Sequence, residues 1–182
     1  MSVQKSLLTH ELRGYIGREV RYTAPEELGR ASIRYFAMAL GDDNPLYRDE
    51  AFARQTRHGG IVAPPTLVCE TNQPYDRQPD ADGYIGHTWG LPLPECRLIR
   101  GANEYEFFQP VRPTDRITAT WRISDIYERD TSHGGLMLFV ASEVTYHNQA
   151  GELLAINRET VIYQPRFPSP GGRGGEGNQD VR

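Results

Sequence analysis

Apolar and polar residues alternate along the second half of the chain, a pattern typical of β-strands that bury one face. The alternating segments are residues 101–108, 116–128, 136–147 and 153–164. In the second of them, Ile117, Trp121 and Ile123 share one face, while polar residues occupy much of the other. Residues 130–135 and 148–151 carry the glycine and asparagine chemistry of hairpin turns. The pattern therefore predicts an antiparallel sheet with four long strands.

Helical spacing replaces this alternation in the first half of the chain. We expect helices at residues 6–16, 25–40, 49–55 and 66–71, and a short strand at 18–23. The longest helix would start at a capping box formed by Thr23 and Glu26, with Pro25 in its first turn. Gly29 could divide it in two. Its expected buried stripe is Leu28, Ile33, Phe36, Ala37 and Leu40. Helices followed by long antiparallel strands indicate an α+β fold.

Composition indicates one globular domain over residues 1–165 and a disordered tail rich in Gly and Pro over residues 166–182. The chain has 182 residues and a net charge of −4, so it lacks the basic surface of proteins that bind nucleic acids or acidic membranes. No apolar run approaches the roughly 18 residues of a membrane span, and residues 1–5 do not begin a signal peptide. Cys69 and Cys96 do not form a metal-ligand spacing. We therefore expect a cytoplasmic protein whose partners are small molecules or other subunits.

A polar bend follows the longest expected helix at residues 41–49, with the sequence Gly-Asp-Asp-Asn-Pro-Leu-Tyr-Arg-Asp. Gly41 suits the C-terminus of a helix because glycine tolerates positive φ. Asn44 precedes Pro45 and is therefore pushed out of the helical region. On local chemistry alone, the bend is a helix stop followed by a turn.

Residues 35–49, 60–67 and 105–117 together resemble the ordered landmarks of the MaoC-like hot-dog family. This family includes type 2 enoyl-CoA hydratases and 3-hydroxyacyl thioester dehydratases, and the resemblance extends over roughly residues 14–164. It implies a hot-dog fold, in which an antiparallel sheet wraps around a central helix, here residues 66–71. It also implies a dimer of hot-dog units and acid–base chemistry on a thioester without a metal or an organic cofactor.

The resemblance carries roles onto individual residues of the bend. Asp42 matches the family aspartate that helps to activate water, and Asn44 matches the asparagine that follows it. Tyr47 stands where the family has its histidine, and a phenol that titrates near pH ~10 donates a hydrogen bond but is a poor base. Pro64 and Pro65 stand where the family has His-Gly, and Pro65 lacks the N–H that would bind the thioester oxygen.

Further candidates surround these positions, and each has a second interpretation. Asn44, Pro65 and Thr66 would contact the substrate. Arg112 could meet a CoA phosphate or serve only its turn or an interface. His87, in a long loop before the strands, could supply the missing base together with Asp42 or could simply order the loop. His58 is interpreted as a turn residue.

The chain differs from the family pattern in having Tyr47 in place of the histidine and Pro64 and Pro65 in place of His-Gly. Both differences occur together in the N-terminal-type branch of the family. This branch resembles the non-catalytic half of two-domain hydratases and one subunit of heterodimeric hydroxyacyl dehydratases. Our hypothesis is that the chain binds an acyl-CoA or acyl-carrier-protein thioester and works with a catalytic MaoC-like partner. Alternatively, it is a self-sufficient homodimeric hydratase that uses Asp42 with His87 or Tyr47. A third interpretation is a non-enzymatic hot-dog protein that binds acyl thioesters or assembles a partner.

Overall fold

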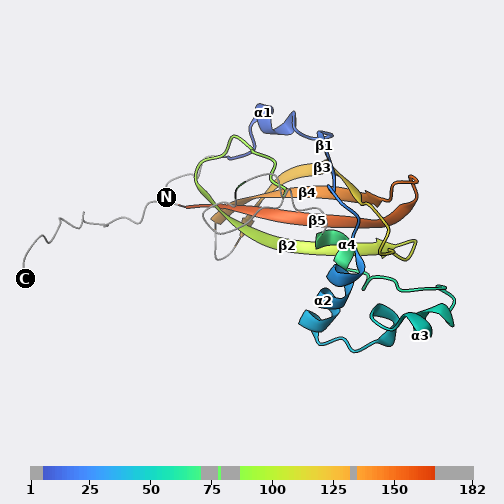
Figure 1. The fold of residues 1–182 in the computed structure, drawn as a ribbon. Helices are drawn as coiled ribbons and strands as arrows, with labels where there is room; N and C mark the ends of the chain where they lie inside the picture. The colour runs from blue at the N-terminus through green and yellow to red at the C-terminus, as the bar shows by residue number, and fades with distance from the viewer. Residues whose placement is uncertain (1–5, 71–77, 79–86, 132–134, 167–182) are drawn as a thin grey trace, which may run out of the picture.

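Five antiparallel strands form one sheet in the order β1-β3-β4-β5-β2 (Figure 1). The computed structural model describes residues 6–70, 78, 87–131 and 135–166. The strands are β1 (Glu19–Thr23), β2 (Cys96–Phe107), β3 (Thr118–Thr131), β4 (Gly135–His147) and β5 (Leu153–Pro165). The predicted short strand and four long strands are therefore confirmed. β2 starts at residue 96 instead of 101, because Cys96 already pairs with Pro165 at the end of β5.

The described helices are short and lie mostly to one side of the sheet. They are α1 (His10–Arg13), α2 (Arg30–Leu40), the 3-10 helix η1 (Pro45–Tyr47), α3 (Glu50–Arg54) and α4 (Leu67–Glu70). Figure 1 shows α2 and α3 grouped outside the sheet, with α4 between α2 and the strands. Val68 of α4 is fully buried. The helices expected at residues 49–55 and from residue 66 are thus confirmed, as is the α+β class.

Some of the predicted segments fall outside the described residues. They are residues 167–182 of the expected tail and, apart from residues 78 and 87–94, the long loop that contains His87, which we expect over residues 73–94. In the parts that are described, no helix is long and apolar enough to cross a membrane.

The predicted start of the longest helix is wrong. Helix α2 begins at Arg30 and not at Pro25, and Thr23 is the last residue of β1 rather than a helix cap. The Thr23 hydroxyl lies 2.9 Å from the hydroxyl of Thr118, and the N–H of Ala24 donates to the carbonyl of Ile117 at 2.8 Å. Hydrogen bonds to the neighbouring strand therefore override the capping signal. Gly29, with φ of 76°, turns the chain into the helix.

Two other expectations at the N-terminal side need correction. The helix predicted at residues 6–16 contains only α1, because the N–H groups of Leu7 and Leu8 both donate to the carboxylate of Glu128 on β3. Leu40, expected in the buried stripe of α2, is 60% exposed, whereas Ile33 is fully buried. In the first case, a contact between distant segments, which no local pattern encodes, decided the outcome.

The sheet bends along one line across its strands. Register shifts occur in β3 between Ile123 and Asp125, and in β2 between Arg100 and Ala102. The two irregularities face each other across the sheet, because Asp125, Ala141, Thr160 and Ala102 form one continuous row of paired residues. Bulges increase the local twist and bend of a strand. Two of them in line allow the sheet to curve around the elements on its inner face.

The two faces of the sheet differ in chemistry. The inner face carries the core, including Ile123, Leu138, Val140, Val144 and Tyr146, each at most 1% exposed. The outer face carries a row of alternating charges, one on each strand. Its members, in register, are Glu19, Arg122, Glu143, Arg158 and Glu104. The inner face therefore packs against the helices, while the outer face is suited to water.

Candidate functional site

The polar bend after α2 is built as the sequence predicts. Gly41 ends the helix in the left-handed conformation with φ of 68°, and its N–H donates to the carbonyl of Met38 at 3.1 Å. The Asp42 carboxylate accepts from the N–H of Asn44 at 3.0 Å, and the Asn44 side chain accepts from the N–H of Leu46 at 3.0 Å. Two consecutive side-chain-to-backbone hydrogen bonds thus hold the bend in one shape. Asp42 itself is exposed.

Tyr47, the last residue of η1, lies at the end of this bend and is half-buried. Burial raises the pKa of the Tyr47 hydroxyl above its ordinary value of 10.0, and the nearby Asp42 charge raises it further. A hydrogen bond between the side chains of Tyr47 and Asn44 acts in the opposite direction. Near neutral pH the group is therefore a protonated phenol, which donates a hydrogen bond but does not remove a proton from water.

A cavity of about 350 Å³ lies beside Tyr47, and we call it the Tyr47 cavity. Most of its wall is apolar, including Leu46, Val62, Pro65, Phe107, Phe108 and Val111. Four polar side chains also line it, namely Tyr47, Arg57, His58 and Gln109. Its size and its mixture of an apolar wall with a few polar groups are typical of small-molecule sites. It is therefore the candidate binding site.

Four chain segments meet at this cavity: η1 at the end of the bend, the turn after α3, the segment that leads into α4, and the end of β2 with the residues that follow it. The Arg112 guanidinium joins two of them, because its Nη1 atom donates to the carbonyl of His58 at 3.0 Å. The N–H of Arg112 donates to the buried carboxylate of Asp115 at 2.7 Å. Arg112 thus has a structural role, because it links two segments of the cavity wall. Its contact with a CoA phosphate stays a prediction.

His58 is a cavity residue that the sequence did not reveal. We expected a turn residue, and its backbone does turn, with its N–H donating to the Thr56 hydroxyl at 3.2 Å. Its side chain nevertheless lines the cavity together with Tyr47 and contacts Arg57. No local signal could have found this, because the opposite wall comes from residues about fifty positions further along the chain.

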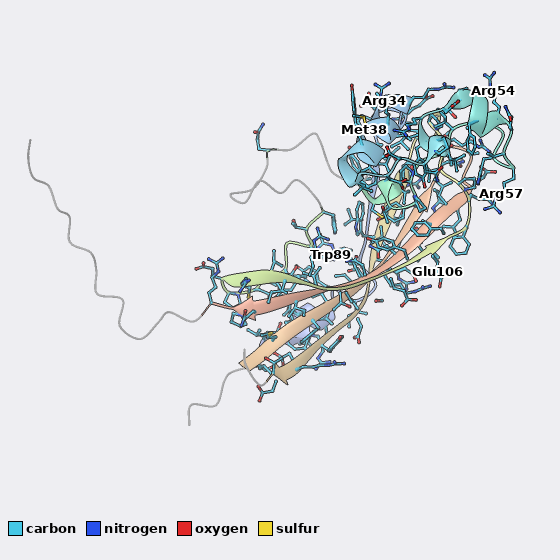
Figure 2. The ribbon with its side chains drawn as sticks, turned by 90° about the horizontal axis from the view of Figure 1, so that it is seen from below. Arg34, Met38, Arg54, Arg57, Trp89 and Glu106 are labelled. Carbon is cyan, nitrogen blue, oxygen red and sulfur yellow. The ribbon has the colours of Figure 1, made fainter. Side chains whose placement is uncertain are left out.

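His87 lies in different surroundings from the Tyr47 cavity. Its ring stacks on Trp121 of β3 at 4.8 Å and meets Trp89 edge-on at 4.5 Å. Trp89 in turn donates from its indole N–H to the hydroxyl of Ser142 at 3.1 Å. None of these residues lines the cavity, and Figure 2 shows Trp89 well away from Arg57 along the length of the sheet.

The start of α4 brings Pro65 to the cavity and leaves Thr66 exposed at its side. The N–H of Leu67, the first backbone donor of α4, donates to the carbonyl of Pro64 at 3.0 Å. Pro65 has no N–H to offer to a ligand oxygen. Among the described residues, moreover, no group of three or more His, Cys, Asp or Glu side chains could hold a metal ion.

A larger hollow, of about 850 Å³, crosses the outer face of the four long strands. Three of its charged residues pair with one another, because Arg158 lies 3.2 Å from Glu143 and 3.8 Å from Glu104. It contains none of the residues of the bend. We therefore assign the candidate site to the Tyr47 cavity.

The curved sheet and the inner helix define a hot-dog fold, which solved MaoC-like proteins share. The chain belongs to the family described as FAS1-like, dehydratase domain region, whose model matches residues 15–157.

Comparison with known proteins agrees with this class. A UPF0336 protein of Streptomyces coelicolor is 36% identical over 137 residues, which are 75% of this chain and 84% of the relative. Among solved structures, a MaoC-like dehydratase from Rhodospirillum rubrum matches with a TM-score of 0.63 and 19% identity, covering 84% of this chain and 94% of that one. The HadBC (3R-hydroxyacyl-ACP dehydratase) complex of Mycobacterium tuberculosis matches with a TM-score of 0.61 and 22% identity, covering 81% and 96%. These two structures share the fold with this chain.

Proposed function

We propose that this protein is the substrate-binding subunit of an acyl thioester hydratase or dehydratase, acting with a MaoC-like partner that carries the catalytic base. The reaction would be the reversible hydration of a 2-enoyl thioester on CoA or on an acyl carrier protein. The observation that carries the proposal is Tyr47, which stands beside Asp42 and Asn44 with a raised pKa where this chemistry needs a base.

The chemistry explains why one chain would be insufficient. Hydration needs a base for the attacking water, an acid for the neighbouring carbon, and donors for the thioester oxygen. Asp42 can accept a hydrogen bond from water and Tyr47 can donate one, so the bend can orient a ligand. Tyr47 cannot supply the base, and Pro65 cannot supply the backbone donor. The proposed reaction is acid–base chemistry and requires no metal or organic cofactor.

The position of the cavity supports a partner subunit. β2 is an edge strand of the sheet that the described residues form, and a sheet edge is a ready surface for another strand. Leu98, Phe107 and Phe108, on or next to β2, are 46–56% exposed, and the two phenylalanines also line the Tyr47 cavity. A hot-dog partner pairing along β2 would cover these side chains and close the cavity. The solved HadBC complex is an assembly named as a dehydratase, which is consistent with this arrangement.

The test is an assay of crotonyl-CoA hydration by the purified chain, by a MaoC-like chain with an intact Asp/His pair, and by the two mixed. We expect the isolated chain to be inactive, the mixture to be active, and the two chains to elute together on size-exclusion chromatography. Full activity of the isolated chain, lost on Asp42→Ala, would instead establish a self-sufficient hydratase. Binding of acyl-CoA without turnover in any mixture would establish a non-enzymatic role.

A further inference from the structure

The arginines around the Tyr47 cavity differ in how their charges are compensated. Residues 30–57 contain five arginines, and all five are described. Arg30 and Arg54 both pair with Glu50, at 2.8 and 3.0 Å. Arg48 pairs with Asp43 at 3.0 Å.

The two other arginines have no carboxylate at ion-pair distance within the described chain. Arg34 lies over the ring of Tyr35, with its guanidinium carbon 5.1 Å from the ring centroid. Arg57 donates from Nε to Nε2 of His58 at 3.4 Å, a long contact that leaves its outer nitrogens available. Of the five, only Arg57 lines the cavity, and Figure 2 shows Arg34 and Arg57 on different sides of the helical group.

The backbone that carries Arg57 is held in place on both sides. The Thr56 hydroxyl donates to the carbonyl of Ala53 at 2.7 Å, and the carbonyl of His58 accepts from Arg112 at 3.0 Å. The uncompensated guanidinium is therefore carried by a fixed backbone at the edge of a mostly apolar cavity. Such a cavity suits an elongated, mostly uncharged ligand with an anionic group at one end. Guanidinium matches phosphate especially well, because its planar fork forms two parallel hydrogen bonds with it.

We propose that Arg57 binds the phosphate of a pantetheine arm, with the arm itself lying in the Tyr47 cavity. This inference rests on the proposed function, which supplies the thioester carrier. The phosphate next to pantetheine is common to CoA and to acyl carrier proteins, so the site recognises the part that the two carriers share. Arg112 is less available for this role, since its Nη1 is already bound to the His58 carbonyl.

The experiment is calorimetric titration of the full chain, without a partner, with 4′-phosphopantetheine and with pantetheine. We expect 4′-phosphopantetheine to bind more tightly than pantetheine by about tenfold, the effect of one charge-assisted contact at an exposed edge. Arg57→Gln should remove this difference. Arg34→Gln should preserve it, because Arg34 is an equally uncompensated arginine outside the cavity. The difference should also shrink with added salt.

Retention of the phosphate preference in Arg57→Gln would overturn the proposal, and so would an equal loss in Arg34→Gln. Both side chains are exposed, so thermal melts of both variants should match wild type and exclude misfolding. Repeating the titrations with CoA and with a phosphopantetheinylated carrier protein distinguishes the two sources of the arm. Because this measurement involves no turnover, its outcome is independent of the hydration assay that tests the proposed function.

Discussion

Nη1 of Arg112 donates to the main-chain carbonyl of His58 at 3.0 Å, across 54 positions of the sequence. This single contact joins the turn after α3 to the segment that follows β2, and both segments line the Tyr47 cavity. The shape of the cavity therefore depends on a tertiary hydrogen bond as well as on the bend that carries Asp42.

Removing this tie should lower stability by an amount typical of one hydrogen bond. We expect Arg112→Ala to reduce the free energy of unfolding by about 1–2 kcal/mol, measured by urea denaturation. Arg122→Ala is the matched control, because Arg122 is an exposed arginine whose contact with Glu19 is long, at 3.8 Å. The control should change stability by less than about 0.5 kcal/mol. Equal effects of the two substitutions would show that the Arg112 contact is not a structural tie.

Tyr47→His should give the isolated chain hydration activity on crotonyl-CoA, because an imidazole beside Asp42 supplies the missing base. A well-placed general base contributes about 100-fold to 10,000-fold. The lack of an N–H at Pro65 limits the gain, so we expect a rate about tenfold above the background rate that is measured with the inactive wild-type chain. The rate should rise with pH through about 6.5, since only neutral imidazole accepts a proton. Tyr47→Phe is the control and should give no gain in the hydration rate. A similar gain in Tyr47→Phe would show that a base at position 47 is not the cause.

Tyr105 should make stability fall at high pH. Burial, together with the neighbours Cys69 and Glu159, raises its pKa from 10.0 to about 12. Because the folded pKa exceeds the unfolded one, the contribution to stability is complete below pH 10 and is lost as pH rises toward 12. We expect a loss of about 1 kcal/mol, since the phenol is partly exposed and solvent screens it.

The comparison with Tyr105→Phe isolates this effect from other groups that titrate in the same range. The difference in the free energy of unfolding between wild type and the variant should shift between pH 10 and 12. A difference that stays constant over this range would contradict the assigned pKa.

Gly101→Ala should destabilise the sheet at its bend. A Cβ atom there would lie 3.0 Å from Cδ1 of Ile162 and 3.1 Å from the carbonyl oxygen of Thr160, and the latter is backbone that cannot move aside easily. We expect a loss of about 1–3 kcal/mol, read as a lower thermal midpoint. Gly60→Ala is the control, because its nearest neighbour is the Glu50 carboxylate at 3.8 Å. If the two variants have the same thermal midpoint, close packing at the bulge does not constrain residue 101.

The sequence by itself determined the strands and the bend. Alternation gave four long strands, because a sheet with one buried face imposes a period of two on its residues. The bend from Gly41 to Tyr47 followed from local chemistry, since a left-handed glycine, an Asn side chain and Pro45 each act within a few residues.

Only the tertiary structure decided where α2 begins and what forms the cavity. Thr23 carries a helix-capping signal, but its pairing with Thr118 on β3 places it in a strand, and pairing between distant residues leaves no periodic trace. The cavity wall likewise contains residues from distant segments, namely Arg57, His58 and Phe108. These segments come together because the sheet curves and because Arg112 hydrogen-bonds to the carbonyl of His58. Local sequence patterns reflect interactions between residues that are close in the sequence. A cavity, in contrast, forms where distant segments of the chain come together.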